Sequence, residues 1–374
     1  MQLAAMPKGR SATNFFIAVI LRGAFQMTTS AEALPESRRV FRLFPEGEAL
    51  RFELKNEGLP ALAPNHVLVR IKAASLNYRD LLVARGQVKG VKEGLIPLSD
   101  GAGEVMATGQ GTTRWRPGDR VAPIFYSAWH TGRFYTDYIA SGLGAGTADG
   151  VLADVIAVHE DALVRLPDAY DFAEGATLPC AAVTAWQSLI VRGGLAEGDT
   201  LLVQGTGGVA LFGLQIANAV GARTIVISSS DEKCRRAIEM GASATVNYRT
   251  VPEWDIEVRR LTDGLGASHI LELVGPATFD RSLRALRAGG HIAQIGVITG
   301  FGVQSNLFRL QQINGTIDGI NVGSREQFEA MNDFFCKHGI RPAIDRIFPM
   351  EETSAALEEL ANGMHFGKLV IGLN

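Results

Sequence analysis

The sequence predicts an α/β protein in which a β-rich part precedes a doubly wound parallel sheet. Two observations indicate the parallel sheet. A glycine-rich turn joins a buried strand to an apolar helix at residues 201–217, and strands then alternate with helices as far as residue 297. The third observation is a set of short strands punctuated by glycine between residues 38 and 159, which indicates the β-rich part.

The glycine-rich turn carries a dinucleotide-binding motif. Gly205, Gly207 and Ala210 satisfy the pattern G-x-G-x-x-G/A. The first glycine allows a tight turn, the second lets the backbone approach a pyrophosphate, and the small third residue lets helix and strand pack closely. The pyrophosphate would accept hydrogen bonds from the free N–H groups at the start of the helix. The prediction therefore includes Thr206 and residues 208–209 (Gly208, Val209) among the residues that bind a cofactor.

The alternation that follows predicts further strands and helices on the same sheet. The strands are expected at 224–227, 244–248, 268–274 and 291–297. The helices are expected at 231–241, 254–261 and 279–286, the last ended by Gly289-Gly290. Ligands bind such sheets at the carboxyl ends of the strands. The turn, residues 228–230, Val274-Gly275 and Gly296-Val297 are therefore expected to form one rim around one ligand.

The end of the second strand bears on the choice between NAD and NADP. An NAD site usually has an acidic residue there that binds the ribose 2′-OH. Here the strand ends in three serines, of which Ser228 and Ser229 are expected to contact the cofactor, with Lys233 and Tyr248 nearby. Hydroxyl and ammonium donors suit a 2′-phosphate, and Asp231 is expected to act as a helix N-cap. The sequence therefore favours NADP, and NADPH as the reduced form.

The β-rich part is expected to contain six strands and one long loop. The strands are predicted at 40–44, 49–54, 66–72, 100–108, 120–125 and 154–159. The loop at 126–150 contains five glycines, and loops of this length are uncommon unless they are functional or mobile. We expect it to border the substrate pocket.

Length and composition exclude several classes of protein. The 374 residues suffice for two domains, and a net charge of −3 argues against nucleic acid or an anionic membrane as a partner. Cys180, Cys234 and Cys336 share no short spacing, which excludes a four-cysteine zinc lobe and fits a reducing, cytoplasmic location. The apolar run at 15–21 is too short to span a bilayer. Residues 1–27 are either a disordered leader after an upstream start or a targeting segment.

Several further motifs occur in an order that resembles the medium-chain dehydrogenase/reductase superfamily. They lie at residues 74–80, 99–105, 116–121, 176–186 and 365–370, and the similarity covers about residues 38–374. The resemblance implies a leader at 1–37, a GroES-like catalytic domain at 38–178 and a Rossmann NADP-binding domain at 179–312. It also implies that residues 313–374 complete the sheet edge and the catalytic domain, and that a strand at 319–325 and a helix at 326–337 lie near a homodimer surface.

The same resemblance assigns roles to individual residues. Thr184 matches a position that contacts the nicotinamide, and Lys368 a position near the cofactor phosphates. Asn77 matches a position that forms a hydrogen bond near the nicotinamide or the reacting oxygen, and the alternative is that it only shapes a turn. Tyr78, which follows it, is expected either to donate a proton or a hydrogen bond to the substrate or to be a packed aromatic residue. Asp80 is expected to be structural and to pair with Arg79 or Arg120.

The metal ligands of the superfamily are largely missing from this chain. Zinc-dependent members bind the metal through a cysteine, a histidine and a second cysteine, and the matching positions here are Asn77, Ser99 and Cys180. A catalytic zinc needs three protein ligands of N, S or O type, so no metal is expected and Cys180 is interpreted as a buried filler. The chain is similar to the zinc-independent quinone oxidoreductases and enone reductases, although related sequences often carry the name zinc-type alcohol dehydrogenase-like.

The sequence thus predicts an NADPH-dependent oxidoreductase that transfers hydride to a quinone or to the activated C=C bond of an enone. The partner is a small-molecule substrate, without nucleic acid or membrane. Two alternatives stay open. One is an NAD(P)-dependent alcohol dehydrogenase, and the other is a nucleotide-binding protein without enzymatic activity, like crystallin relatives or RNA-binding members of the superfamily.

Overall fold

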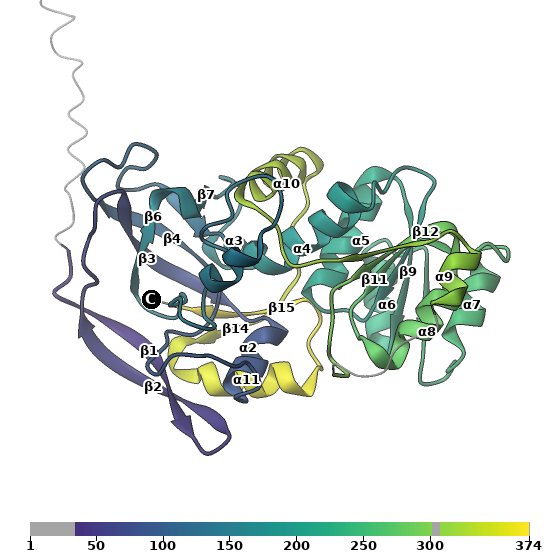
Figure 1. Ribbon diagram of the computed structural model, residues 1–374, viewed down its shortest axis with the longest axis horizontal. Helices are drawn as coiled ribbons and strands as arrows, with labels where there is room; N and C mark the ends of the chain where they lie inside the picture. The colour runs from purple at the N-terminus through teal and green to yellow at the C-terminus, as the bar shows by residue number, and fades with distance from the viewer. Residues whose placement is uncertain (1–33, 301–306, 374) are drawn as a thin grey trace, which may run out of the picture. The chain divides into compact units, whose positions relative to one another are not determined.

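The parallel sheet occupies the middle of the chain, in the computed structural model that describes residues 34–300 and 307–373 (Figure 1). The predicted leader at 1–37 lies outside the described residues as far as position 33. The strand order is β10-β9-β8-β11-β12-β13, and all of its pairs are parallel. The strands are β8 (Thr200–Gln204), β9 (Arg223–Ser228), β10 (Ala244–Asn247), β11 (Ala267–Glu272), β12 (Leu286–Gln294) and β13 (Thr316–Gly319).

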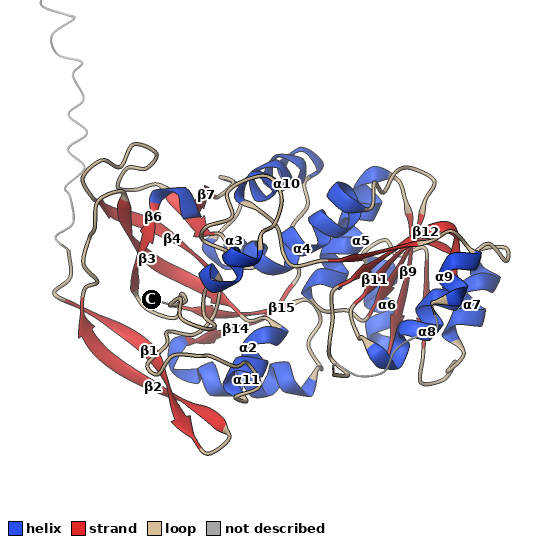
Figure 2. Ribbon diagram, viewed as in Figure 1, coloured by secondary structure: helices blue, strands red, loops and turns tan. Residues whose placement is uncertain are grey.

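Both faces of this sheet are buried, which explains why its strands are nearly uninterrupted runs of apolar residues. Successive side chains point to opposite faces, so Leu201 and Val203 belong to one hydrophobic cluster and Leu202 to another. Figure 2 shows helices on both sides of the sheet. These helices are α5 (Gly208–Val220), α6 (Asp231–Glu239), α7 (Trp254–Leu261), α8 (Pro276–Ala285) and α9 (Phe308–Gln312).

A second, mostly antiparallel sheet has the order β14-β15-β3-β4-β5-β7, with β6 also paired to β3. Its strands are β3 (His66–Ser75), β4 (Asp100–Thr108), β5 (Arg120–Pro123), β6 (Val155–His159), β7 (Leu163–Arg165), β14 (Ile344–Pro349) and β15 (Lys368–Gly372). In the C-terminal segment, β13 forms the edge of the parallel sheet, whereas β15 pairs with β3 through Val370 and Ser75. Strands β1 (Ser37–Glu46) and β2 (Ala49–Gly58) form a separate antiparallel hairpin.

In the part of the chain that the structure describes, five further α-helices lie outside the set that flanks the parallel sheet. They are α2 (Tyr78–Ala84), α3 (Phe172–Ala176), α4 (Val183–Trp186), α10 (Arg325–His338) and α11 (Thr353–Asn362). Two π-helical segments, Leu178–Ala182 and Gln187–Arg192, flank α4. None of the helices in the described ranges combines the length and the apolar character needed to cross a membrane.

Several predictions about individual elements are wrong. The N-cap of α6 is Ser230, because its side chain accepts the hydrogen bond from the Lys233 N–H, and Asp231 is the first helical residue. Helix α8 ends at Ala285, and Gly289-Gly290 lies inside β12, in an irregular stretch between Leu286 and His291, the residues that pair with β11. The predicted edge strand at 319–325 is β13, which ends at Gly319. The loop at 126–150 contains a 3₁₀ helix, Thr136–Ser141.

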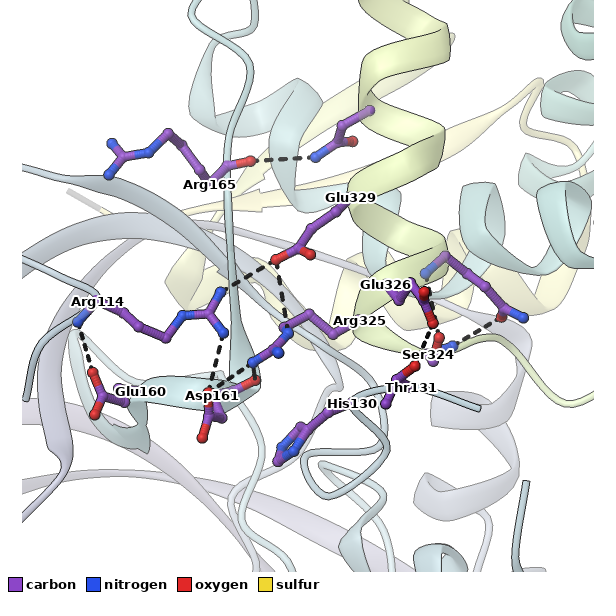
Figure 3. Close-up of polar contacts among 12 residues, drawn as sticks. Arg114, His130, Thr131, Glu160, Asp161, Arg165, Ser324, Arg325, Glu326 and Glu329 are labelled. Atoms are coloured by element: carbon purple, nitrogen blue, oxygen red, sulfur yellow. Dashed lines mark hydrogen bonds and ion pairs between the residues drawn. The ribbon is translucent and has the colours of Figure 1, made fainter. Parts of the chain in front are cut away.

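Helix α10 is fastened to the antiparallel sheet and to this loop by polar contacts. Figure 3 shows Asp161 between Arg114 and Arg325, with Nη–Oδ1 distances of 3.1 and 2.8 Å. Glu329 is 3.2 Å from the other terminal nitrogen of Arg114. The N–H groups of Arg325 and Glu326 donate to the carbonyls of residues 129 and 130 at 3.1 and 3.0 Å. The ion pairs and the loop that follows residue 126 are thus tied to the same end of α10.

Candidate active site

A cavity of about 1040 Å³ lies between the glycine-rich turn and the residues around Asn77. It brings together residues that are distant in the sequence: every predicted site residue except Gly275 lines it. These residues are Asn77, Tyr78, Thr184, Gly205, Thr206, Gly207, Gly208, Val209, Ser228, Ser229, Lys233, Tyr248, Gly296, Val297 and Lys368. The neighbouring Val274 lines the cavity in place of Gly275.

The glycine-rich turn leaves open space where a cofactor would approach. Gly205 has a φ of +79°, a conformation that favours glycine, and no atom lies within 4 Å of where a Cβ of Gly207 would be. Ala210 is buried against the core, as the third position of the motif requires. The Gly367 N–H donates to the Thr206 carbonyl at 2.8 Å, which ties the turn to the C-terminal segment.

A buried polar network that the sequence reasoning missed holds the neighbouring rim. Glu272, at the end of β11, accepts hydrogen bonds from Gln204 Nε2 (2.7 Å), Thr278 Oγ1 (2.7 Å) and Ser282 Oγ. It also accepts from the Gly275 N–H at 3.0 Å, and Gln204 Oε1 accepts from the Leu273 N–H at 3.0 Å. Such fully satisfied networks rigidify their surroundings. Gly275 therefore supports the rim through Glu272, although its own atoms do not line the cavity.

The end of β9 presents hydroxyl and ammonium groups to the cavity. Ser228, Ser229, Lys233 and Tyr248 line it, whereas Asp231 does not. The Asp231 carboxylate instead accepts a hydrogen bond from Asn247 Nδ2 at 2.7 Å. Lys233 Nζ donates to the carbonyl of residue 363 at 2.7 Å, and burial lowers the pKa of this lysine.

At the other end of the cavity, Asn77 begins helix α2. Its N–H donates to Asp80 Oδ2 at 2.8 Å, and its side-chain Oδ1 accepts from Lys368 Nζ at 2.6 Å. The same ammonium also donates to the Leu76 carbonyl. Asn77 Nδ2 is buried and has no hydrogen-bond partner among the described residues. Lys368, expected near the cofactor phosphates, thus directs its ammonium to Asn77 while its stem covers Gly208.

The other predicted catalytic residue, Tyr78, lies at the rim. Its hydroxyl donates to the Ile298 carbonyl at 3.5 Å. Asp80 is buried, and its nearest arginine is Arg79, whose Nη1 is 4.0 Å from Oδ1. Arg120 instead donates to the carbonyls of residues 168 and 170. Of the two partners expected for Asp80, the structure therefore brings only Arg79 close.

Asp100 connects the other two positions that match metal ligands in the superfamily. It is fully buried and accepts hydrogen bonds from Ser99 Oγ at 2.6 Å and from the Cys180 N–H at 3.0 Å. Burial raises the pKa of Asp100, and the Lys368 ammonium partly offsets this effect. Burial also raises the pKa of the Cys180 thiol well above its usual range, and the Asp100 charge adds to the rise. Cys180 is therefore a neutral thiol.

The part of the cavity beyond Asn77 is mainly apolar. Leu82, Val88, Phe125 and Ile139 line it, and Ile139 belongs to the loop that was expected to border a substrate pocket. Arg79 also lines this part, although the sequence reasoning gave it only a structural role. The wall suits an uncharged organic substrate with one polar group.

The fold and the cavity are those of a dehydrogenase or reductase, and comparisons with known proteins agree. Residues 63–168 match the alcohol dehydrogenase GroES-like domain, and residues 208–337 match the zinc-binding dehydrogenase family. The chain is 37% identical over 320 residues to a zinc-type alcohol dehydrogenase-like protein of Schizosaccharomyces pombe, covering 84% of this chain and 92% of the relative. The chain belongs to the medium-chain dehydrogenase/reductase superfamily and is an oxidoreductase.

Two further similarities extend over nearly the whole chain. An acryloyl-coenzyme A reductase of Metallosphaera sedula is 28% identical over 338 residues, which cover 87% of this chain and 98% of the relative. The crystal structure of a putative alcohol dehydrogenase from Sinorhizobium meliloti has a TM-score of 0.86 and 38% identity, and the match covers 91% of this chain and all of that one.

The residues at the expected zinc position do not fit the metal that the family description names. Asn77 Oδ1 accepts from an ammonium and the Ser99 hydroxyl donates to Asp100, so that of the three positions only Cys180 offers a side chain of a type that binds zinc. A zinc site needs three deprotonated or neutral donors with free lone pairs. Across residues 34–300 and 307–373, no three His, Cys, Asp or Glu side chains are grouped so that they could hold a metal ion.

Proposed function

We propose that the protein is an NADPH-dependent oxidoreductase that transfers hydride, without a metal, to a quinone or to the activated C=C bond of an enone. The observation that carries the proposal is the hydrogen bond from Lys368 Nζ to Asn77 Oδ1. It places a buried cation where a zinc-dependent enzyme needs a lone pair that is free to bind the metal. Quinones and enones suit such a site, because they accept hydride without first losing a hydroxyl proton to a base or metal.

The rim of the cavity supports NADPH as the cofactor. The open space at Gly207 and the start of α5 suit a pyrophosphate, and the serines of β9 with Lys233 suit a 2′-phosphate. The Asp231 carboxylate, which would repel that phosphate, is engaged by Asn247. Thr184 is proposed to contact the nicotinamide. Bound NADPH would supply the hydride, and the chain would orient it and exclude water.

The relatives support both this reaction and one alternative. An acryloyl-coenzyme A reductase acts, by its name, on an activated C=C bond, whereas other relatives are named alcohol dehydrogenases. The alternative is an NAD(P)-dependent alcohol dehydrogenase. It requires a group that takes the proton of the alcohol, and neither the protonated Cys180 nor the ammonium of Lys368 supplies one. We further propose a cytoplasmic homodimer, which sedimentation velocity and cell fractionation would test.

The experiment begins with purified protein from which metal has been stripped with a chelator. NADPH and NADH are titrated by fluorescence, and NADPH oxidation is then followed with a simple quinone and a simple enone. Tight NADPH binding with metal-free turnover is the expected result. Turnover of alcohols alone, and only after zinc is restored, would support the alternative. NADPH binding without any turnover would indicate a nucleotide-binding protein that is not an enzyme, and a preference for NADH would contradict the phosphate site.

A further inference from the structure

We propose that Arg79 binds the acceptor oxygen that becomes negatively charged during hydride transfer, so that the acceptor is an α,β-unsaturated carbonyl compound. This inference rests on the proposed function. It narrows the substrate to one chemical class and assigns a catalytic contact to a residue outside the predicted set.

The position of Arg79 is fixed by two contacts. It lies in the first turn of α2, two residues after Asn77, and lines the cavity. Its Nη1 donates to the Leu143 carbonyl at 2.7 Å, and its guanidinium carbon lies 4.5 Å from the centre of the Phe125 ring. These contacts hold the planar group against the apolar wall rather than in bulk water, where it would be screened.

Some N–H groups of the guanidinium are free to bind a ligand. In the described part of the chain, Nε and Nη2 of Arg79 have no acceptor, and the nearest carboxylate oxygen is 4.0 Å from Nη1. That carboxylate, Asp80, also receives the Asn77 N–H. An arginine presents its N–H groups as a fixed fork that suits an oxygen with developing negative charge.

Of the other donors near Asn77, the Lys368 ammonium and the Tyr78 hydroxyl are already engaged. The Lys368 ammonium donates to the Leu76 carbonyl and to Asn77, and Asn77 Nδ2 is buried. The Tyr78 hydroxyl donates to the Ile298 carbonyl at the rim. Arg79 is close enough to the inner end of the cavity for its charge to lower the pKa of Cys180, against the larger effect of burial. Arg79 therefore combines N–H groups without an acceptor in the described part of the chain with a place in the wall of the cavity.

The chemistry balances with groups already named. Hydride adds to the β-carbon of the acceptor, the electron pair of the C=C bond moves to the carbonyl oxygen, and the resulting enolate oxygen binds Arg79. The α-carbon then takes a proton from water, because an arginine does not give up its own proton in proteins. The net change consumes one NADPH and one proton and yields the saturated carbonyl compound and NADP⁺.

The test uses an enolate mimic and does not depend on turnover. 4-Nitrophenol is titrated into protein saturated with NADP⁺, and its absorbance distinguishes the phenol from the phenolate. We expect the wild type to bind the phenolate. Arg79→Met should weaken this binding at least about tenfold, and Arg79→Lys should weaken it less, because a lysine keeps the charge but loses the fork. Arg85→Met, which removes an exposed arginine outside the cavity, is the matched control.

Activity gives a second readout. For Arg79→Met, kcat/KM for an enone should fall about 10²–10³-fold, the usual loss when one donor to an oxyanion is removed, while the Kd of NADPH stays unchanged. An unchanged NADPH Kd also shows that the variant is folded. The proposal would be overturned if Arg79→Met kept both the phenolate affinity and the enone kcat/KM of the wild type. If the wild type fails to bind NADP⁺, the proposed function fails, and the phenolate titration of the nucleotide-free protein still tests Arg79.

Discussion

Lys368 and Asp100 place opposite charges in a site that water hardly reaches: 4% of the lysine and none of the aspartate is exposed. Removing one of two buried charges that attract each other leaves the other uncompensated, which costs at most about 3–5 kcal/mol, the value for a buried ion pair in contact. We expect Lys368→Met to lower the free energy of unfolding by up to this amount, measured by urea denaturation at neutral pH. Lys337→Met, on the exposed side of α10, should change it little.

A double-mutant cycle tests whether the two charges interact. Asp100→Asn in the Lys368→Met background should recover part of the lost stability, with a coupling free energy of more than about 1 kcal/mol. Strictly additive effects would show that the lysine is held by its carbonyl and amide partners alone.

Asp80 should make stability depend on pH in an unusual direction. Burial raises the pKa of its carboxyl from 3.8 to about 6. Between these values the folded protein holds a proton that the unfolded chain releases, so this group lowers stability as the pH rises. Asp80→Asn keeps an oxygen for the Asn77 N–H but cannot ionise. Relative to the wild type, the free energy of unfolding of this variant should rise by up to about 3 kcal/mol between about pH 4 and pH 7.

Urea denaturation across the pH range measures this difference, in which the other titrating groups cancel. A flat difference for Asp80→Asn would mean that Arg79 keeps the carboxyl ionised throughout.

At the scale of elements, the two glycines of the turn are expected to serve different purposes: Gly205 is needed for folding and Gly207 for cofactor binding. Gly205 has a φ of +79°, so Gly205→Ala should cost about 1–2 kcal/mol of stability. Gly207 has an ordinary φ of −79° and open space around it. Gly207→Ala should therefore leave the free energy of unfolding within about 1 kcal/mol of the wild type. Its methyl group would occupy the space proposed for the pyrophosphate, which should raise the Kd of NADPH at least about tenfold.

Thermal unfolding measures the stability of Gly205→Ala and Gly207→Ala, and a fluorescence titration measures the Kd of NADPH for each variant. The reverse pattern, with Gly207→Ala destabilised and its NADPH affinity intact, would place the pyrophosphate elsewhere.

Local patterns made most elements predictable, and the boundaries that were wrong depend on details that no pattern carries. The Gly289-Gly290 pair is typical of a helix end, and Gly289 has a φ of +69°, yet both residues lie in β12, in an irregular stretch between the residues that pair with β11. Ser230 and Asp231 are both good N-caps, and only the hydrogen bond to the Lys233 N–H distinguishes them.

The contents of the site were predictable as a set, but their connections were not. The motif and the strand ends named the residues that line the cavity, because the carboxyl ends of parallel strands meet at one edge. The direction of the Lys368 ammonium depends on Asn77, which lies 291 positions away, and the Gln204–Glu272 pair joins two strands 68 positions apart. No local pattern encodes such pairs, and Arg79 was missed because its role depends on the apolar wall around it.

At the scale of the whole molecule, α10 joins the antiparallel part to the loop on the substrate side of the cavity. Arg325 contacts Asp161 of the antiparallel part (Figure 3), and its N–H donates to the Trp129 carbonyl in the loop that carries Ile139. Because these charges are partly exposed, each pair contributes no more than about 1 kcal/mol, and salt screens it. The network therefore serves to hold the loop more than to stabilise the fold.

Arg325→Met should consequently raise the KM for the acceptor several-fold, because the loop is less well fixed, while the Kd of NADPH and the melting temperature change little. The wild type in about 1 M salt should approach the KM of the variant, since the Debye length there is about 3 Å. Steady-state kinetics at saturating NADPH, with and without salt, measure both effects, and Arg85→Met is the control for the loss of one charge. A fall in stability of several kcal/mol with an unchanged KM would instead assign the ion pairs to the fold. An unchanged KM and an unchanged stability would mean that backbone hydrogen bonds alone hold the loop against α10.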